Sequence, residues 1–217
     1  MKKIYLVLAA LIITVAGFSQ ARIGVQVIGN ASSVSFQSDN ITDAKKSLQP
    51  AFGAGLVADI PLAGNLSVRP SINFLQKKNS IKFGDAGQPT EVKTSLNYAE
   101  LPVDFVYTIP AKAVSFYFGA GPSIGYGISG KIKYRGFAED ENGQTVAVDE
   151  SVDAFKKEDK GGAGMGRVDI SLNAIAGVKL TNGMFVNAGY LGSLRNLAQG
   201  DGKYKNYGLQ LTVGYFF

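Results

Sequence analysis

Residues 170–180, ISLNAIAGVKL, place apolar side chains at every second position, with mostly small or polar side chains between them. Successive side chains of an extended strand point to opposite faces, so this alternation predicts a β-strand with one apolar and one polar face. A tight turn, Thr181–Gly183, follows, and a second alternating segment begins at Met184. The two segments therefore predict an antiparallel hairpin, and the function depends on which face lies inside the protein.

Eight strands of this kind follow one another along the chain. They are expected at residues 23–30, 51–60, 66–77, 96–109, 114–128, 168–180, 184–194 and 206–217. Most have about the 9–11 residues that a tilted strand needs to cross a bilayer. The connections after the second, fourth and sixth strands are tight, namely Leu62–Asn65, Pro110–Ala113 and Thr181–Gly183, whereas the others are long and polar. Short turns on one rim and long loops on the other are typical of an outer-membrane barrel with periplasmic termini.

The longest connection covers residues 129–167 and is rich in charged residues. A structureless connection of this length is unusual in a compact domain. We therefore expect Lys131–Tyr134 and Thr145–Val148 to extend the hairpin beyond the membrane. We interpret the rest as a solvated loop. A loop that binds a divalent cation or another ligand is the alternative, although the spacing of its carboxylates matches no calcium-loop pattern.

The polar face of the predicted sheet consists mainly of Gly, Ser, Thr and Asn, which suit the crowded interior of a narrow barrel. The outward aromatics cluster at two heights, represented by Tyr126 near the long loops and Phe116 near the short turns. These two residues are ten positions apart. At about 3.3 Å per residue and a tilt of about 40°, they are separated by roughly 25 Å of height. The apolar band between the aromatic girdles of membrane barrels has this height. We predict that the apolar face meets lipid, and a soluble lipocalin-like exported barrel is the alternative.

The first 21 residues predict a secretory signal peptide. Lys2 and Lys3 precede an apolar core that is too short for a confident membrane helix, and small residues follow at cleavage spacing. Cleavage is expected after Ser19 or after Ala21, which leaves residues 22–217 as one barrel domain.

The chain contains no cysteine and no histidine. Their absence excludes disulfides, anchoring through a lipidated cysteine, histidine-based triads and histidine metal sites. We therefore predict no catalytic residues, no metal, no cofactor and no enzymatic activity. The formal net charge of +5 is spread along the chain without a basic run, and so it gives no indication of nucleic-acid binding.

Strand parity directs a set of charged side chains into the barrel. These are Asp59, Arg69, Glu100, Asp104, Asp169, Lys179 and Arg195. Buried charges must be paired or neutralised, and Arg69 on the third strand lies between carboxylates on the second and fourth. We predict a salt-bridge cluster that fills a lumen too narrow for a channel. A gate or a small polar binding site is the alternative.

The chain ends in Tyr207–Phe217, which alternates to its last residue and places Tyr215 and Phe217 on one face. With this ending, the eight strands and the signal peptide, the mature chain resembles the eight-stranded outer-membrane β-barrel family, the OmpA/OmpX-like group. More narrowly it resembles the PorT-like barrels of Bacteroidetes. The resemblance implies a Gram-negative outer-membrane protein whose Tyr215 and Phe217 form the C-terminal signal that the barrel-assembly machinery reads.

We thus predict an all-β, eight-stranded antiparallel up-and-down transmembrane β-barrel with a plugged lumen. It is expected to act as a structural or interaction protein through its extracellular loops, with outer-membrane lipid and an unidentified extracellular or periplasmic protein as partners. The PorT-like resemblance implies a link to protein secretion. The alternative function is a narrow ligand-binding or transport barrel with a polar path past Arg69, Glu100 and Asp104.

Overall fold

The computed structural model describes residues 21–37, 45–83, 90–139, 145–197 and 203–217. The predicted signal peptide lies outside this part of the chain except for its last residue. The strands are β1 (Arg22–Gln37), β2 (Lys45–Ala63), β3 (Leu66–Phe83), β4 (Thr90–Ile109), β5 (Val114–Glu139), β6 (Thr145–Asp153), β7 (Val168–Leu180), β8 (Met184–Ser193) and β9 (Lys203–Phe216), and η1 (Glu158–Lys160) is a short 3-10 helix. No helix in the described ranges has the length and apolarity needed to cross a membrane.

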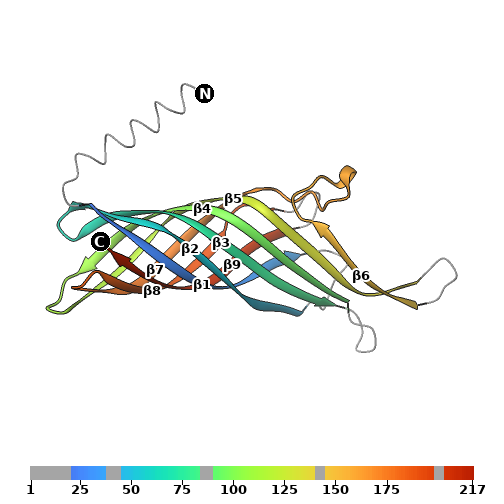
Figure 1. Ribbon diagram of the computed structural model, residues 1–217, viewed down its shortest axis with the longest axis horizontal. Coiled ribbons are helices and arrows are strands. Elements are labelled where there is room, and N and C mark those ends of the chain that lie inside the picture. The colour runs from blue at the N-terminus through green and yellow to red at the C-terminus, as the bar shows by residue number, and fades with distance from the viewer. Residues whose placement is uncertain (1–20, 38–44, 84–89, 140–144, 198–202) are drawn as a thin grey trace, which may run out of the picture.

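Eight of the strands form a closed antiparallel ring, in the order β1, β2, β3, β4, β5, β7, β8, β9. The ring closes where β9 pairs with β1, from Gly24 opposite Phe216 to Gln37 opposite Lys203. Figure 1 shows the tilted barrel, with the start of β1 and the C-terminus at the same end. The predicted eight-stranded up-and-down barrel is confirmed.

The remaining strand, β6, lies outside the ring and pairs with the second half of β5, from Lys131 opposite Asp153 to Glu139 opposite Thr145. β5 has 26 residues, more than twice the number that a tilted strand needs to cross a bilayer. The hairpin predicted within residues 129–167 therefore exists. It is longer than predicted and projects from the end of the barrel opposite the C-terminus (Figure 1).

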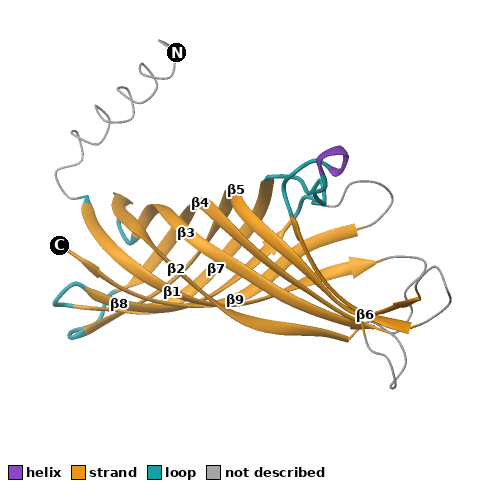
Figure 2. Ribbon diagram, turned by 45° about the vertical axis from the view of Figure 1, so that its right-hand side comes forward, coloured by secondary structure: helices purple, strands orange, loops and turns teal. Residues whose placement is uncertain are grey.

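The three predicted tight turns lie together at the end of the barrel that holds the C-terminus (Figure 2). β4 and β5 are joined by Pro110–Ala113, and β7 and β8 by Thr181–Gly183. Gly183 has a φ of 94°, a backbone conformation that residues with a Cβ atom rarely adopt. The hairpin that the alternation around this turn predicts is therefore confirmed.

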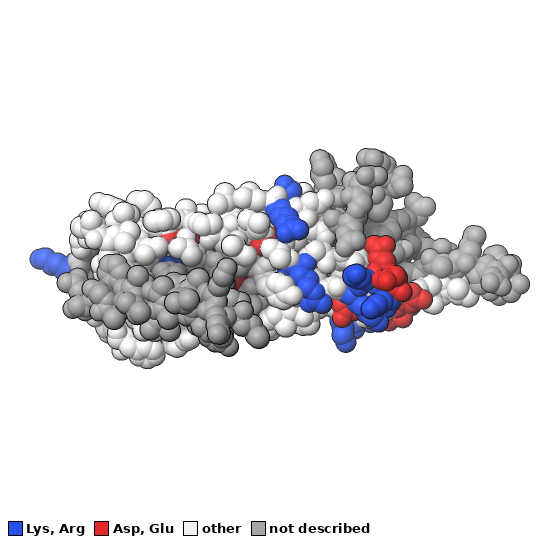
Figure 3. Space-filling model, turned by 90° about the horizontal axis from the view of Figure 1, so that it is seen from above, with Lys and Arg blue, Asp and Glu red and all other residues white. Residues whose placement is uncertain are grey.

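The apolar face of the sheet is the outer face. Leu172 and Ile124 keep 53% and 55% of their surface exposed, and Phe116 and Tyr126, which represent the two predicted aromatic girdles, are exposed as well. On the face drawn in Figure 3, most of the charged residues gather towards the right-hand end of the barrel. A soluble protein does not expose an apolar surface of this extent, so the soluble lipocalin-like alternative is wrong.

Candidate functional site

The barrel lumen holds six of the seven predicted charged residues. Arg69 occupies the part of the lumen near the short turns. The Cζ atom of Arg69 lies 4.4 Å from the ring centre of Tyr117 and 5.4 Å from that of Phe216. Its nitrogens have no hydrogen-bond partner among the described residues, and its ion pair with Asp59 spans 3.5 Å. The guanidinium is therefore held mainly over aromatic rings, in the geometry of a cation–π interaction.

Asp59 links three strands around this cation. Its carboxylate accepts a hydrogen bond of 2.7 Å from the hydroxyl of Ser67 on β3 and one of 3.2 Å from Lys179 on β7. Together with Arg69, also on β3, these residues form what we call the lower charge cluster. Pairing of this kind is what allows a carboxylate to lie in the interior of a narrow barrel.

A second group, the upper charge cluster, surrounds Lys77. The Nζ atom of Lys77 lies 2.6 Å from Glu100 Oε1 and 3.0 Å from Asp169 Oδ2. The side chain of Lys77 is 2% exposed and that of Asp169 is 0% exposed. Asn206 donates a further hydrogen bond of 3.2 Å to Asp169 Oδ2, and Nζ lies 4.8 Å from the ring centre of Tyr98. One cation thus bridges carboxylates from β4 and β7.

Lys77 was missed by the sequence reasoning because the third strand was predicted to end there. Its parity could have identified it, since Lys77 lies eight positions after Arg69 and so on the same face of β3. Because β3 continues to Phe83, the side chain lies deep in the barrel and not at its rim.

Two further residues that were predicted to belong to the salt-bridge cluster, Asp104 and Arg195, belong to neither charge cluster. Asp104 lies opposite Arg69 in the β3–β4 register, yet it accepts its hydrogen bonds from Asn173, at 3.1 and 3.0 Å. The charges predicted to form one salt-bridge cluster around Arg69 thus form two separate clusters among the described residues. Arg195 was predicted inside the barrel, which is wrong: β8 ends at Ser193, and Arg195 is exposed in the bend that follows.

A cavity of about 40 Å³ adjoins both clusters and is lined by polar and apolar residues, among them Ser71, Asn73 and Asn173. This volume holds only a few water molecules. Asn173 Oδ1 has no hydrogen-bond partner among the described residues, and so a water molecule is its expected partner.

The mouth of the barrel opposite the C-terminus is covered by the chain that follows β6. Phe155 is buried and packs edge-on against Tyr98, with ring centres 5.9 Å apart. A Cβ atom at Gly127 would collide with the ring of Phe155, so glycine leaves the space that the ring fills. Arg167 holds this lid in place: its Cζ lies 5.1 Å from the Phe155 ring centre, and its Nη1 donates a 2.8 Å hydrogen bond to the carbonyl of Gly127. No pattern in the sequence predicts this lid.

The described residues contain no group of three or more His, Cys, Asp and Glu side chains that could hold a metal ion. At the short-turn end of the barrel, Tyr215 and Phe217 are exposed on the outer face, and their ring centres are 5.6 Å apart.

Comparisons with known proteins agree with this architecture. Residues 18–199 match the family model described as the outer membrane protein beta-barrel domain. No curated protein sequence matches the chain.

Solved structures that are similar to the chain include three outer-membrane barrels. Ail of Yersinia pestis, solved in complex with the heparin analogue sucrose octasulfate, is 18% identical, with 90% of this chain and 99% of that chain covered and a TM-score of 0.40. Neisserial surface protein A is 15% identical, with 92% and 100% covered and a TM-score of 0.42. The N-terminal barrel domain of Pseudomonas aeruginosa OprF is 13% identical, with 91% and 100% covered and a TM-score of 0.32.

Proposed function

Because the chain belongs to the outer membrane protein β-barrel domain family, we propose that it is a non-conducting barrel that presents an interaction surface outside the cell. The barrel lies in the lipid of the Gram-negative outer membrane. The proposed role is structural and non-enzymatic, and a protein that contacts the extracellular hairpin is the proposed partner.

The observation that carries this proposal is the filling of the lumen. The lower charge cluster, the upper charge cluster and the Phe155 lid follow one another from the periplasmic to the extracellular end. The cavity of about 40 Å³ beside them is far smaller than the roughly 300–1,000 Å³ of a small-molecule site. An eight-stranded barrel is just wide enough for side chains to fill its interior. These features support a plugged barrel over a transport path past Arg69, Glu100 and Asp104.

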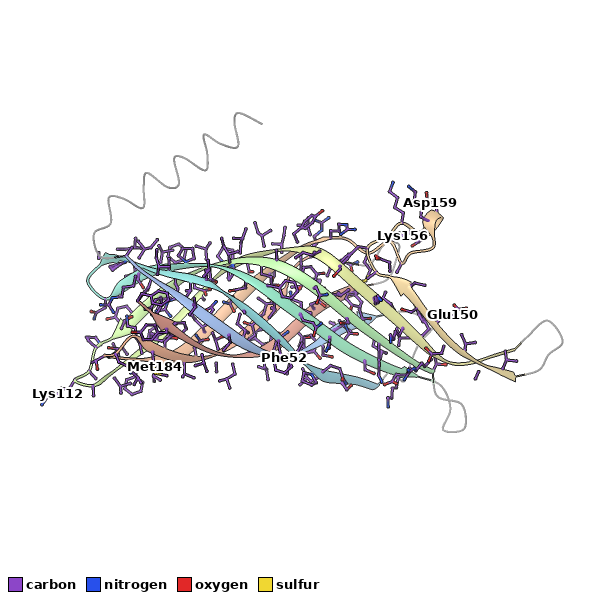
Figure 4. The ribbon with its side chains drawn as sticks, in the orientation of Figure 1. Phe52, Lys112, Glu150, Lys156, Asp159 and Met184 are labelled. Carbon is purple, nitrogen blue, oxygen red and sulfur yellow. The ribbon has the colours of Figure 1, made fainter. Side chains whose placement is uncertain are left out.

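The interaction surface of the proposal is the hairpin of β5 and β6 together with residues 154–167. In Figure 4, Glu150, Lys156 and Asp159 lie at the end opposite Lys112, which marks the short-turn rim. The hairpin exposes charged and apolar side chains side by side, including Tyr134 and Val146, a mixture typical of protein interfaces. A partner in protein secretion is the version that the PorT-like resemblance implies.

The conductance of the protein in a planar lipid bilayer tests the plugged lumen. We expect no stepwise conductance, because the proposed plug of two charge clusters and the Phe155 lid would block an aqueous path. A sixteen-stranded porin in the same bilayer serves as the positive control. Discrete conductance steps from folded protein would overturn the proposal in favour of the transport barrel.

The interaction surface is tested with a variant in which Arg135 is joined to Asp149 by a two-residue Asn-Gly turn. These two residues are register partners in β5 and β6, so the turn should close the shortened hairpin without disturbing the ring. We expect this variant to fold. When it is expressed in a strain that lacks the gene, however, we expect it to fail to restore the wild-type phenotype. Full restoration would contradict a role for the hairpin.

We also propose that the barrel-assembly machinery reads Tyr215 and Phe217, whose exposed rings lie at the periplasmic end. Replacement of Phe217 by alanine is then expected to lower the fraction of folded barrel in membranes. An unchanged fraction would exclude this role.

A further inference from the structure

The outer wall of β3, β4 and β5 changes from apolar to polar between two successive rows of outward-facing residues. Phe74, Ala99 and Tyr126 face lipid in one row across these three strands. In the next row, Gln76 donates a 3.2 Å hydrogen bond to Asn97, which donates one of 3.0 Å to Ser129. This polar row marks the extracellular edge of the lipid-facing band.

Lysines occupy the two rows beyond this edge. Lys78 and Lys131 flank Ser95 in the first of these rows, and Lys93 lies opposite Lys133 in the second. Two residues along a strand tilted by about 40° rise by about 5 Å, so the first lysine row lies about 10 Å above Tyr126. Headgroups occupy the first several ångströms beyond the hydrocarbon core. Lysine side chains reach across this distance to the membrane interface.

These lysines line a groove of about 450 Å³ on the outer wall. Among the described residues, its lining contains one carboxylate, Asp153, whose Oδ1 accepts hydrogen bonds from the backbone N–H groups of Phe155 and Lys156. Among the described residues, Lys78, Lys131 and Lys133 form no ion pair, whereas Lys93 pairs with Glu91 at 3.1 Å. The groove therefore has an excess of unneutralised positive charge.

Glu91 lies above the groove and outside the membrane-spanning part of β4. Burial raises the pKa of its carboxyl. The Ser80 hydroxyl, Lys93 and Lys82 together lower this pKa by more, so that it lies below its usual value. Glu91 is thus held as a carboxylate between Lys93 and Lys82. The other three lysines of the groove remain available for a ligand.

We propose that this groove binds the phosphorylated headgroup of a glycolipid in the outer leaflet. Charge complementarity calls for an anion, and lysine is a common phosphate ligand in proteins. The volume is that of a sugar-sized ligand site. The apolar wall of Phe74 and Tyr126 directly below is exposed and offers contact to acyl chains. A soluble anion would make no use of that wall, and so the ligand is assigned to a lipid.

The test measures binding to folded protein purified from membranes in detergent. The probe is a glucosamine-disaccharide lipid that carries two phosphates (diphosphoryl lipid A), and its dephosphorylated form and soluble glucosamine 6-phosphate are compared with it. We expect the phosphorylated lipid to bind at least about tenfold more tightly than either. Equal affinity for the dephosphorylated lipid would overturn the phosphate site, and equal affinity for the soluble sugar phosphate would overturn the lipid as the ligand.

The variant K78Q/K131Q/K133Q is expected to lose at least about tenfold in affinity for the phosphorylated lipid, since each lysine near an anionic headgroup contributes about fivefold. The matched control K156Q/K157Q/K160Q removes the same charge from exposed positions around η1, outside the groove, and should bind within twofold of the wild type. An equal loss in both variants would show a general charge effect and overturn the site. If the triple variant does not fold, the single variant K131Q replaces it, and its affinity for the phosphorylated lipid is expected to fall by about fivefold.

Discussion

Replacing Lys77 by methionine is expected to destabilise the folded barrel by about 3–5 kcal/mol, the usual cost of removing one partner from a buried charge pair. Lys77 is the one cation within 4 Å of Glu100 and Asp169 among the described residues. Without it, two buried carboxylates remain without a counter-charge, which the interior does not tolerate. The free energy of unfolding in urea, followed by the gel mobility of folded and unfolded protein in lipid vesicles, measures the effect.

Two further variants make this result specific. Lys112→Met removes a lysine from an exposed turn and should change the stability by less than about 0.5 kcal/mol. The combined variant K77M/E100Q/D169N removes all three charges and should recover much of the lost stability, because hydrophobic or neutral replacements of whole buried clusters are well tolerated. If K77M were as stable as the wild type, or no less stable than the combined variant, Lys77 would not neutralise these carboxylates.

Replacing Leu172 by arginine is expected to cost about 2–4 kcal/mol, the value for a cation on the lipid face near the bilayer midplane. Leu172 points outward from β7 and pairs with Pro122, midway between the girdle residues Phe116 and Tyr126 of β5. The same urea titration in vesicles measures this loss.

Val146→Arg is the matched control for this substitution. Val146 is an exposed apolar residue of β6 beyond the membrane, so its replacement should cost less than about 0.5 kcal/mol. Equal effects at Leu172 and Val146 would mean that the wall around Leu172 does not face lipid.

The ring and its outer face could be predicted because lipid requires an apolar side chain at every outward position. β7 was predicted with its observed limits, Val168–Leu180, since both of its ends coincide with a change in this pattern. Where strands leave the membrane, water accepts many side chains on either face and the alternation fades. For this reason β5 was predicted to Ile128 but continues to Glu139.

The partners of the charges could not be predicted in the same way. Parity shows which side chains point inward, but the height at which they meet depends on how far neighbouring strands are shifted against each other. Lys77 and Asp169 are 92 residues apart, on strands that do not pair with each other. The aromatic surroundings of Arg69 come from β5, β8 and β9, and their assembly is a property of the closed ring.

The lysine groove depends on register for the same reason. Lys78 and Lys131 belong to strands on either side of β4, and both are aligned with Ser95. The irregular register between Asn97 and Tyr98 shifts the outward positions of β5, so that Ser129, Lys131 and Lys133 face outward beyond it. A count of alternate residues along β5 alone would have placed these lysines inside the barrel.

The central claim is that the outer face of the barrel lies in lipid and that its lumen is filled. The reactivity of two single-cysteine variants at neighbouring positions, measured in intact membranes, tests this claim. The chain has no native cysteine, and Ser123 is 0% exposed whereas the adjacent Ile124 points outward. We predict that Ile124→Cys reacts with a lipid-soluble thiol reagent and not with a charged, water-soluble one. Ser123→Cys should react with neither reagent until the barrel is unfolded by boiling. Reaction of Ser123→Cys with the water-soluble reagent in folded protein would show an open aqueous lumen and contradict the account.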